Sequence, residues 1–428
     1  MDYMSIDFKP LFEAMRGGTA FAEMYVPYIF KGREMEKRAV ETDISDVIES
    51  GLSKCRLFLA DYGGGKSTLG RFISYRGQEN GMLISVLSDQ DYKNIFKQDD
   101  FFISIMRNLR MNGLKPGSNP LKEIMEAWSE EQLAELTEDS EPQSIEQVTR
   151  YLKDHHDITS DLFLDFSACY LFSKLKDRPT DPLVGYFSGE HVDKRTLKTQ
   201  YGFTHFLDNN GLAFLRDFSS FLRSIHLPGM VIILDELETL TSKRSDVLEK
   251  TYIFLREFWD LLLNGDTSGI LGIMLSTEEW INDSKKGVKS YPALYDRFKN
   301  GNNNQNTRSS TIILNTLAES DYRELYDELF SLYDQTYSTD FGALDRVSQQ
   351  LWDYLKMLNS SFDGEINAVS PRDFIKDIVN ALDSIADYLH FHDNGELPEN
   401  LEEMISAKQP INPSLTLGES DEELDTLF

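Results

Sequence analysis

The sequence predicts an α/β fold: a parallel sheet flanked by helices on both faces. Short apolar runs of strand length alternate along the chain with stretches of helical periodicity, an order that is typical of parallel sheets. The runs are apolar throughout instead of alternating with polar residues, so both faces of each strand are expected to be buried. The predicted strands are 56–60, 81–87, 229–234, 269–275 and 311–314.

The domain organisation follows from the length and the pattern. A chain of 428 residues is too long for one ordinary core. Residues 1–50 are expected to form an N-terminal helical lead-in, and residues 51–318 the α/β core, with a helical insertion at about 99–202. Residues 319–393 have helical spacing and predict a C-terminal helical lid or a winged-helix domain, and residues 394–428 predict an acidic flexible tail.

The composition excludes several classes of protein. The formal net charge of −29, from 72 acidic and 43 basic side chains, opposes sequence-independent coating of DNA, although a local basic groove stays open. Cys55 and Cys169 lie far apart and outside any CxxC pattern, so two buried thiols are expected and no zinc site or disulfide framework. No signal peptide is evident and no stretch approaches the ~20 apolar residues of a membrane span, so a cytoplasmic protein is expected.

A phosphate-binding loop is the most specific motif. Residues 60–67 fit the P-loop pattern GxxxxGKS, with Ala60 in place of the first glycine. The glycines let backbone N–H groups close around a β-phosphate, Lys66 can reach the β- and γ-phosphates, and the Ser67 hydroxyl can bind Mg²⁺. The loop lies between a predicted strand and a helix N-terminus, a context that favours an anion site over an incidental glycine-rich turn. The residues expected to bind nucleotide are Asp61, Tyr62, Gly63, Gly64, Gly65, Lys66, Ser67 and Thr68.

An apolar strand that ends in Asp235-Glu236 is the second motif. P-loop ATPases need one carboxylate to hold Mg²⁺, which is the role expected of Asp235, and another to polarise the attacking water, which is the role expected of Glu236. Glu238 is the alternative catalytic carboxylate. Alternatively, the two carboxylates could simply cap the helix that follows the strand. The presence of a phosphate-binding loop earlier in the chain disfavours this alternative.

Three further polar residues are candidates for the catalytic site. Ser276, at the end of the strand 269–275, is expected to face the ligand crevice, whereas capping of the next helix by Ser276-Thr277 is an equal alternative. Arg297 and Arg372 are candidates for stabilising transition-state charge, since a guanidinium is always ionised and binds phosphate in a bidentate way. A surface ion pair is the alternative for each arginine.

The motifs together resemble a known class of ATPase. The phosphate-binding loop, the 234–238 box, Ser276-Thr277 and Arg372 resemble AAA+ or STAND-like ATPases related to origin-recognition proteins, in which a helical or winged-helix domain follows the core. Within that group, the loop, the 234–238 box and the segment 181–190 resemble the ATP-binding proteins of BREX-type bacterial phage-resistance systems. The long insertion departs from the better-known AAA+ pattern.

The resemblance implies a biological context that composition does not. It implies ATP rather than GTP as the nucleotide, Mg²⁺ as the metal, and a place in a DNA-directed defence system. It also implies partner proteins of helicase or methyltransferase type, and it leaves homo-oligomer formation open.

The motifs and the resemblance predict an ATPase switch that converts ATP to ADP and phosphate. Its nucleotide state would move the C-terminal helical domain through Arg372. The alternative from another class is a non-hydrolysing scaffold that binds nucleotide and recruits partners. A small-molecule or nucleotide kinase is disfavoured, because the insertion has no evident arginine cluster for a mobile lid.

Overall fold

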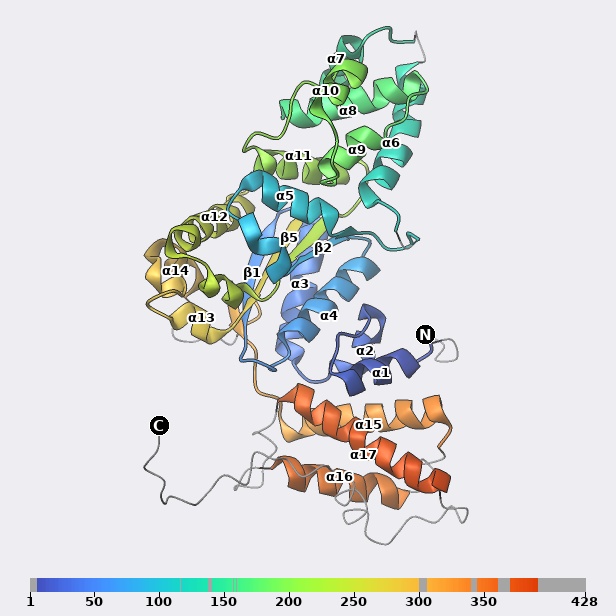
Figure 1. Ribbon diagram of the computed structural model, residues 1–428, viewed down its shortest axis with the longest axis vertical. Helices are drawn as coiled ribbons and strands as arrows, with labels where there is room; N and C mark the ends of the chain where they lie inside the picture. Colours follow the sequence, from blue (N-terminus) through green and yellow to red (C-terminus); the bar gives the residue numbers. More distant parts are fainter. Residues whose placement is uncertain are drawn as a thin grey trace, which may run out of the picture. The chain divides into compact units, whose positions relative to one another are not determined.

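The computed structural model has the predicted α/β architecture, with a sheet between layers of helices (Figure 1). It describes residues 6–115, 117–137, 141–156, 158, 160–299, 306–339, 345–360 and 370–391. The chain forms two compact units, one from Ala22 to Leu317 and one that combines Met1–Phe21 with Ala318–Phe428.

The sheet belongs to the unit Ala22–Leu317 and has six strands in the order β3-β2-β4-β5-β1-β6. All five predicted strands are present and pair in parallel. The antiparallel edge strand β3 was not predicted, because a strand of two residues has no periodicity to detect. The strands are β1 (Lys54–Leu59), β2 (Leu83–Leu87), β3 (Leu109–Arg110), β4 (Met230–Leu234), β5 (Ile270–Ser276) and β6 (Thr311–Ile313).

Helices cover both faces of the sheet, as the unbroken apolar strands predict. All five residues of β4 are fully buried, and alternate residues point to opposite faces. Val231 faces α4 (Lys66–Glu79), where a Cβ at Gly77 would lie 3.1 Å from it, so the glycine permits close packing of helix on sheet. Met230 and Leu234 point to the other face and belong to a large hydrophobic core there.

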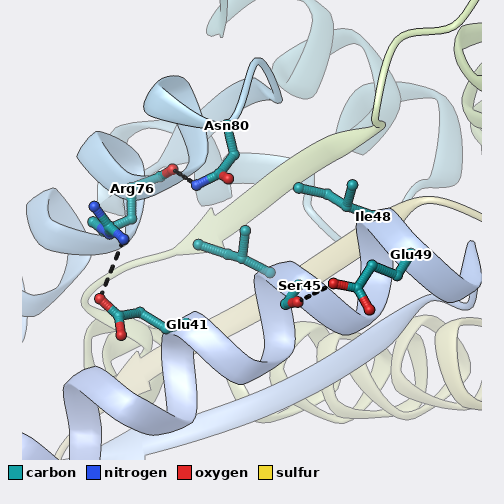
Figure 2. Close-up of a pocket in the computed structure, with 7 residues that line it drawn as sticks. Glu41, Ser45, Ile48, Glu49, Arg76 and Asn80 are labelled. Atoms are coloured by element: carbon teal, nitrogen blue, oxygen red, sulfur yellow. Dashed lines mark hydrogen bonds and ion pairs between the residues drawn. The ribbon is translucent and has the colours of Figure 1, made fainter.

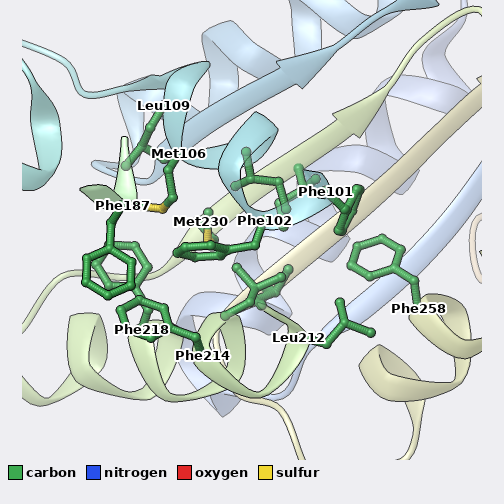
Figure 3. Close-up of a cluster of buried hydrophobic side chains, with 14 of the residues drawn as sticks. Phe101, Phe102, Met106, Leu109, Phe187, Leu212, Phe214, Phe218, Met230 and Phe258 are labelled. Carbon is green, nitrogen blue, oxygen red and sulfur yellow. The ribbon is translucent and has the colours of Figure 1, made fainter. Parts of the chain in front are cut away.

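The helical insertion shares that core instead of forming one of its own (Figure 3). Phe214 of α11 (Gly211–Ser224), which follows the insertion, is fully buried, and its ring centroid lies 4.8 Å, 5.2 Å and 4.5 Å from those of three phenylalanines of the insertion, Phe102, Phe163 and Phe187. Phe102 belongs to α5 (Gln98–Arg107), which packs on β2. The other helices of this unit are α2 (Val26–Ile29), α3 (Glu34–Ser50), α6 (Pro120–Leu136), α7 (Ile145–His155), α8 (Asp161–Leu175), α9 (Asp181–Phe187), α10 (Lys194–Tyr201), α12 (Ser245–Leu263), α13 (Glu278–Asn282) and α14 (Pro292–Phe298).

The described residues of the second unit form helices and loops but no strand, so the winged-helix alternative finds no strand there. It contains α1 (Lys9–Gly17), α15 (Glu319–Tyr337), α16 (Asp345–Asn359) and α17 (Pro371–Phe391). Arg16 on α1 donates two hydrogen bonds of 2.7 Å to the carboxylate of Asp383 on α17, which groups the first helix with the last ones. The lead-in predicted for residues 1–50 is thus split between the two units, and the acidic tail predicted at 394–428 lies outside the described residues. Every helix in the described part of the chain is too short or too polar to cross a membrane.

Candidate nucleotide-binding site

The phosphate-binding loop connects β1 to α4. β1 ends at Leu59 and α4 begins at Lys66, and left-handed φ angles of +75° at Gly63 and +96° at Gly65 turn the chain between them. A Cβ on Gly64 would lie 3.0 Å from both the Ala60 Cβ and the Asp61 carbonyl oxygen. Glycine is therefore favoured by the backbone geometry, and the first amides of α4, which have no partner within the helix, can bind an anion.

Lys66 is held against this loop. The residue is only 7% exposed, and its Nζ donates to the carbonyl oxygens of Ala60 at 3.0 Å and Asp61 at 3.3 Å. The same atom lies 3.6 Å from Oε1 of Glu238 and 5.2 Å from the centroid of the exposed Tyr62 ring. A buried ammonium needs such partners, and here the carboxylate partner comes from a distant part of the sequence.

The strand order brings the second motif to the loop. β5 lies between β1 and β4 and is parallel to both, so the carboxyl ends of all three share the edge at which such sheets bind ligands. Asp235 follows β4 at this edge, and its carboxylate accepts a 2.8 Å hydrogen bond from the Glu236 N–H and lies close enough to the Ser67 hydroxyl to interact with it. Burial raises the pKa of Asp235, and the Glu236 N–H and the Ser67 hydroxyl counteract this by favouring the ionised form. The two predicted metal ligands therefore lie together.

Glu236 occupies a strained turn directly after Asp235. Its φ is +58°, a left-handed conformation that few residues other than glycine adopt and that is often found at functional sites. The side chain is largely exposed. Desolvation of its buried part, together with the charge of Asp235, raises the pKa of Glu236. A raised pKa suits a carboxylate that must accept a proton near neutral pH.

Tyr92 supports this turn, a role that the sequence analysis missed. Its buried hydroxyl lies within hydrogen-bonding distance of the carbonyl oxygens of Leu87 (3.2 Å) and Asp235. Burial raises the pKa of Tyr92 well above its usual value, so the phenol keeps its proton as a donor. A tyrosine in the polar segment Asp89–Asn94 gives no sequence signal for such a contact.

Glu238 and Ser276 form a buried pair beside Lys66. The Ser276 hydroxyl donates to Oε2 of Glu238 at 3.0 Å, while the other carboxylate oxygen faces Lys66. Ser276 is fully buried and Glu238 is 9% exposed. Thr277 caps α13, since its hydroxyl accepts a 3.3 Å hydrogen bond from the Trp280 N–H. Each of the two interpretations of Ser276-Thr277 therefore applies to one residue. Ser276 lies beside Glu238 at the candidate site, and Thr277 caps the helix.

The two candidate arginines have partners of their own. Arg297 makes a forked ion pair with Asp260, with hydrogen bonds of 2.5 and 2.6 Å, which matches the ion-pair alternative. Arg372 belongs to the other compact unit, where its Nη2 donates to the carbonyl oxygen of Gly18 at 2.6 Å. Each arginine therefore has partners within its own unit, and the role of each in catalysis stays a prediction.

A groove of about 250 Å³ between α3 and α4 is distinct from this site (Figure 2). Arg76 and Asn80 line it from the last turn and C-cap of α4, whereas the phosphate-binding loop precedes the first turn of this helix of 14 residues. At 1.5 Å per residue the two ends are roughly 20 Å apart. An ion pair of 3.3 Å between Arg76 and Glu41 spans the groove, so its polar groups are largely satisfied by one another.

The residues present fit a nucleotide with magnesium. A Cβ on Gly64 would crowd Ala60 and one on Gly65 would crowd Arg33, so the loop has little room for side chains, and Lys66 supplies a cation beside it. The described residues contain no group of three or more His, Cys, Asp or Glu that could hold a metal ion by itself. Ser67 and Asp235 would instead supply the small ligand set that Mg²⁺ needs when phosphates and water complete its shell.

Comparisons with known proteins give a family and two structural neighbours. No curated protein sequence matches the chain. The ORC2 protein of Aeropyrum pernix in its ADPNP–ADP complexes is a structural neighbour, with a TM-score of 0.43, 12% identity and coverage of 90% of this chain and 70% of that chain. Its ADP form gives a TM-score of 0.40, 13% identity and coverage of 87% and 67%. The model of the BREX system ATP-binding protein BrxC/D family matches residues 7–400. The chain therefore belongs to the BREX system ATP-binding protein BrxC/D family.

Proposed function

We propose that the protein hydrolyses ATP to ADP and phosphate and uses this reaction as a conformational switch. The observation that carries the proposal is the meeting of the two motifs: Lys66 Nζ lies 3.6 Å from the Glu238 carboxylate, and the Ser67 hydroxyl interacts with the Asp235 carboxylate. A phosphate-binding loop alone would suffice for binding. Hydrolysis also needs carboxylates beside the loop, and Asp235, Glu236 and Glu238 supply them.

The residues would divide the work as follows. Lys66 and the amides of the loop bind the β- and γ-phosphates, and Ser67 with Asp235 holds Mg²⁺, which when bound neutralises charge on the phosphate oxygens. Glu236 accepts a proton from the attacking water, a role supported by its raised pKa and its exposed position at the end of β4. The Ser276–Glu238 pair keeps Lys66 oriented. Movement of the C-terminal helical unit through Arg372 and a finger role for Arg297 belong to the same proposal.

The family also gives a setting for the activity. A BREX system component works with other proteins of that system, and we propose partners of helicase or methyltransferase type and DNA as the target, in the cytoplasm. The net charge of −29 opposes direct binding to a polyanion, so contact with DNA would need a local basic surface or a partner.

Phosphate release from ATP tests the proposal. We expect turnover by the wild type to fall by about 10²-fold or more in Lys66→Ala and in Glu236→Gln, because each removes a group that acts on the reacting phosphate or water. Glu249→Gln, the same change at an exposed position on α12, is the matched control and should keep wild-type turnover. Each protein is assayed with and without double-stranded DNA, and stimulation by DNA would support the DNA-directed role. A wild type that binds ATP but releases no phosphate under any condition would instead support the non-hydrolysing scaffold.

A further inference from the structure

Arg33 is a buried cation next to the nucleotide site that neither sequence motif includes. Its side chain is 5% exposed, and it precedes α3, which begins at Glu34. Its φ of +58° is left-handed, like that of Glu236. A strained, buried arginine persists only where its surroundings hold it firmly.

The guanidinium joins two backbone segments that are far apart in sequence. Nη2 donates to the carbonyl oxygen of Gly64 in the phosphate-binding loop at 2.5 Å, and Nη1 donates to the carbonyl oxygen of Asn315 at 2.8 Å. Glu36, which is fully buried, lies 3.8 Å from Nη1 and accepts the Asn315 N–H at 2.9 Å. Arg33 and Glu36 together therefore hold both peptide groups of Asn315, and Arg33 also holds the loop.

The contact with Gly64 orients a phosphate-binding amide. In a planar trans peptide the C=O and the following N–H point in opposite directions. With the Gly64 carbonyl directed at Arg33, the N–H of Gly65 points away from it. Nη2 would also lie 3.3 Å from a Cβ at Gly65, so the guanidinium packs directly on this peptide.

The contact with Asn315 lies at the exit from the core. Asn315 follows β6, which ends at Ile313, and the unit that contains the sheet ends at Leu317. The chain therefore passes into the second unit two residues after the residue that Arg33 and Glu36 hold. The planar guanidinium of an arginine can donate hydrogen bonds to two acceptors at once, whereas the ammonium of a lysine acts as a point charge.

We propose that Arg33 is a positioning residue that orients the Gly64–Gly65 peptide for phosphate binding and couples the loop to the exit segment Asn315–Leu317. Any shift of the loop peptide on phosphate binding moves the acceptor of Nη2, and the same guanidinium carries the change to Asn315. This inference rests on the proposed nucleotide site but not on hydrolysis.

The test compares Arg33→Lys with Arg56→Lys in the full-length protein. Arg56 is also 5% exposed. Like Arg33, it binds two groups: its guanidinium donates to the Asp43 carboxylate on α3 at 2.8 Å and to the backbone carbonyl oxygen of Ser309, which lies just before β6. Arg56 lies within β1, three residues before the strand ends, and its guanidinium donates to Asp43 and Ser309, which are both outside the loop. Both variants lose a buried arginine, but only Arg33→Lys loses a contact with the loop. Comparing them therefore distinguishes the two effects.

Two quantities are measured: ATP affinity by calorimetry, and hydrogen exchange of the segment 314–317 with and without saturating ATP. We expect Arg33→Lys to weaken ATP binding by about 10-fold to 100-fold, the usual effect of losing a charge-assisted hydrogen bond. ATP should slow exchange of the segment in the wild type but not in Arg33→Lys. Arg56→Lys should lower the melting temperature and leave both readouts as in the wild type.

Equal losses of affinity in the two variants, or wild-type affinity and exchange in Arg33→Lys, would overturn the inference. If Arg33→Lys does not fold, Glu36→Gln takes its place, and unchanged ATP-dependent exchange there would overturn the coupling. A wild type that binds ATP without hydrolysing it defeats only the proposed function, because both readouts here depend on binding alone.

Discussion

The phenylalanine core of the insertion and the carboxyl edge of the sheet are both buried, but opposite kinds of group fill them. Around Phe214 the neighbours are aromatic rings in van der Waals contact, and no charge is involved. Around Lys66 the neighbours are carbonyl oxygens and the carboxylate of Glu238, and the adjoining turn has a left-handed glutamate. Apolar burial stabilises the fold, whereas burial of charge costs stability and is kept where chemistry requires it.

The largest effect is expected in the aromatic core. Phe214→Ala should lower the free energy of unfolding by about 3–5 kcal/mol, because it removes a fully buried ring and leaves a cavity. Urea denaturation measures this, and Phe391→Ala, at a position that is 75% exposed, should change stability by less than about 0.5 kcal/mol. Loss of ATP affinity in folded Phe214→Ala without loss of stability would show that the two regions are not independent.

A smaller effect, on turnover alone, is expected at the sheet edge. Glu238→Gln keeps an acceptor for Ser276 but removes the negative charge 3.6 Å from Lys66. We expect phosphate release to fall by about 10-fold to 100-fold, the range in which a charged partner positions a catalytic group. The free energy of unfolding should change little. If Glu238→Gln abolishes turnover while Glu236→Gln retains it, Glu238 is the carboxylate that activates water, as the alternative assignment has it.

The smallest effect is a gain of stability on removing a functional charge. Burial raises the pKa of Asp235, so the folded state binds a proton more tightly than the unfolded state, and the cost of the charge appears as the pH rises above about 4. Asp235→Asn should therefore raise the melting temperature at pH 7 without nucleotide by about 1 °C, which corresponds to less than about 1 kcal/mol. Scanning calorimetry should show the gain shrinking as the pH falls through about 4, below which Asp235 becomes protonated in both states. A lower melting temperature at pH 7 would mean that the interactions of the Asp235 carboxylate with Ser67 and Glu236 outweigh the cost of burial.

The sequence predicted the residues at the carboxyl edge of the sheet better than the residues that support them. The strands, the loop and Asp235 follow from local patterns of apolar and glycine residues, which fix backbone conformation over short distances. The contacts of Tyr92 with the Asp235 carbonyl and of Arg33 with the Gly64 carbonyl could not be predicted, because neither residue belongs to a pattern and both bind backbone atoms. The position of Glu238 could be stated only as an alternative, since its partners Ser276 and Lys66 come from other elements.

The N-terminal helix shows the same limit at the scale of the fold. Helical spacing predicted a helical lead-in, but the ion pair between Arg16 and Asp383 joins residues from opposite ends of the chain. The shared core of insertion and sheet is a second case, since phenylalanines on α5 and α11 reveal their contact only once both helices are placed.

By itself, the sequence determined the α/β class, the order of the parallel strands along the chain, and the glycine, lysine, serine and aspartate of a nucleotide site. These depend on local conformation and on residue chemistry, which neighbouring residues specify. The tertiary structure decided the sheet order, which brings Asp235 close to Ser67. It also decided the pairing of Glu238 with Lys66 and the hydrogen bonds of Arg33 to the loop and to the exit segment. Those contacts join residues far apart in sequence, and only the packing of the whole unit brings them together.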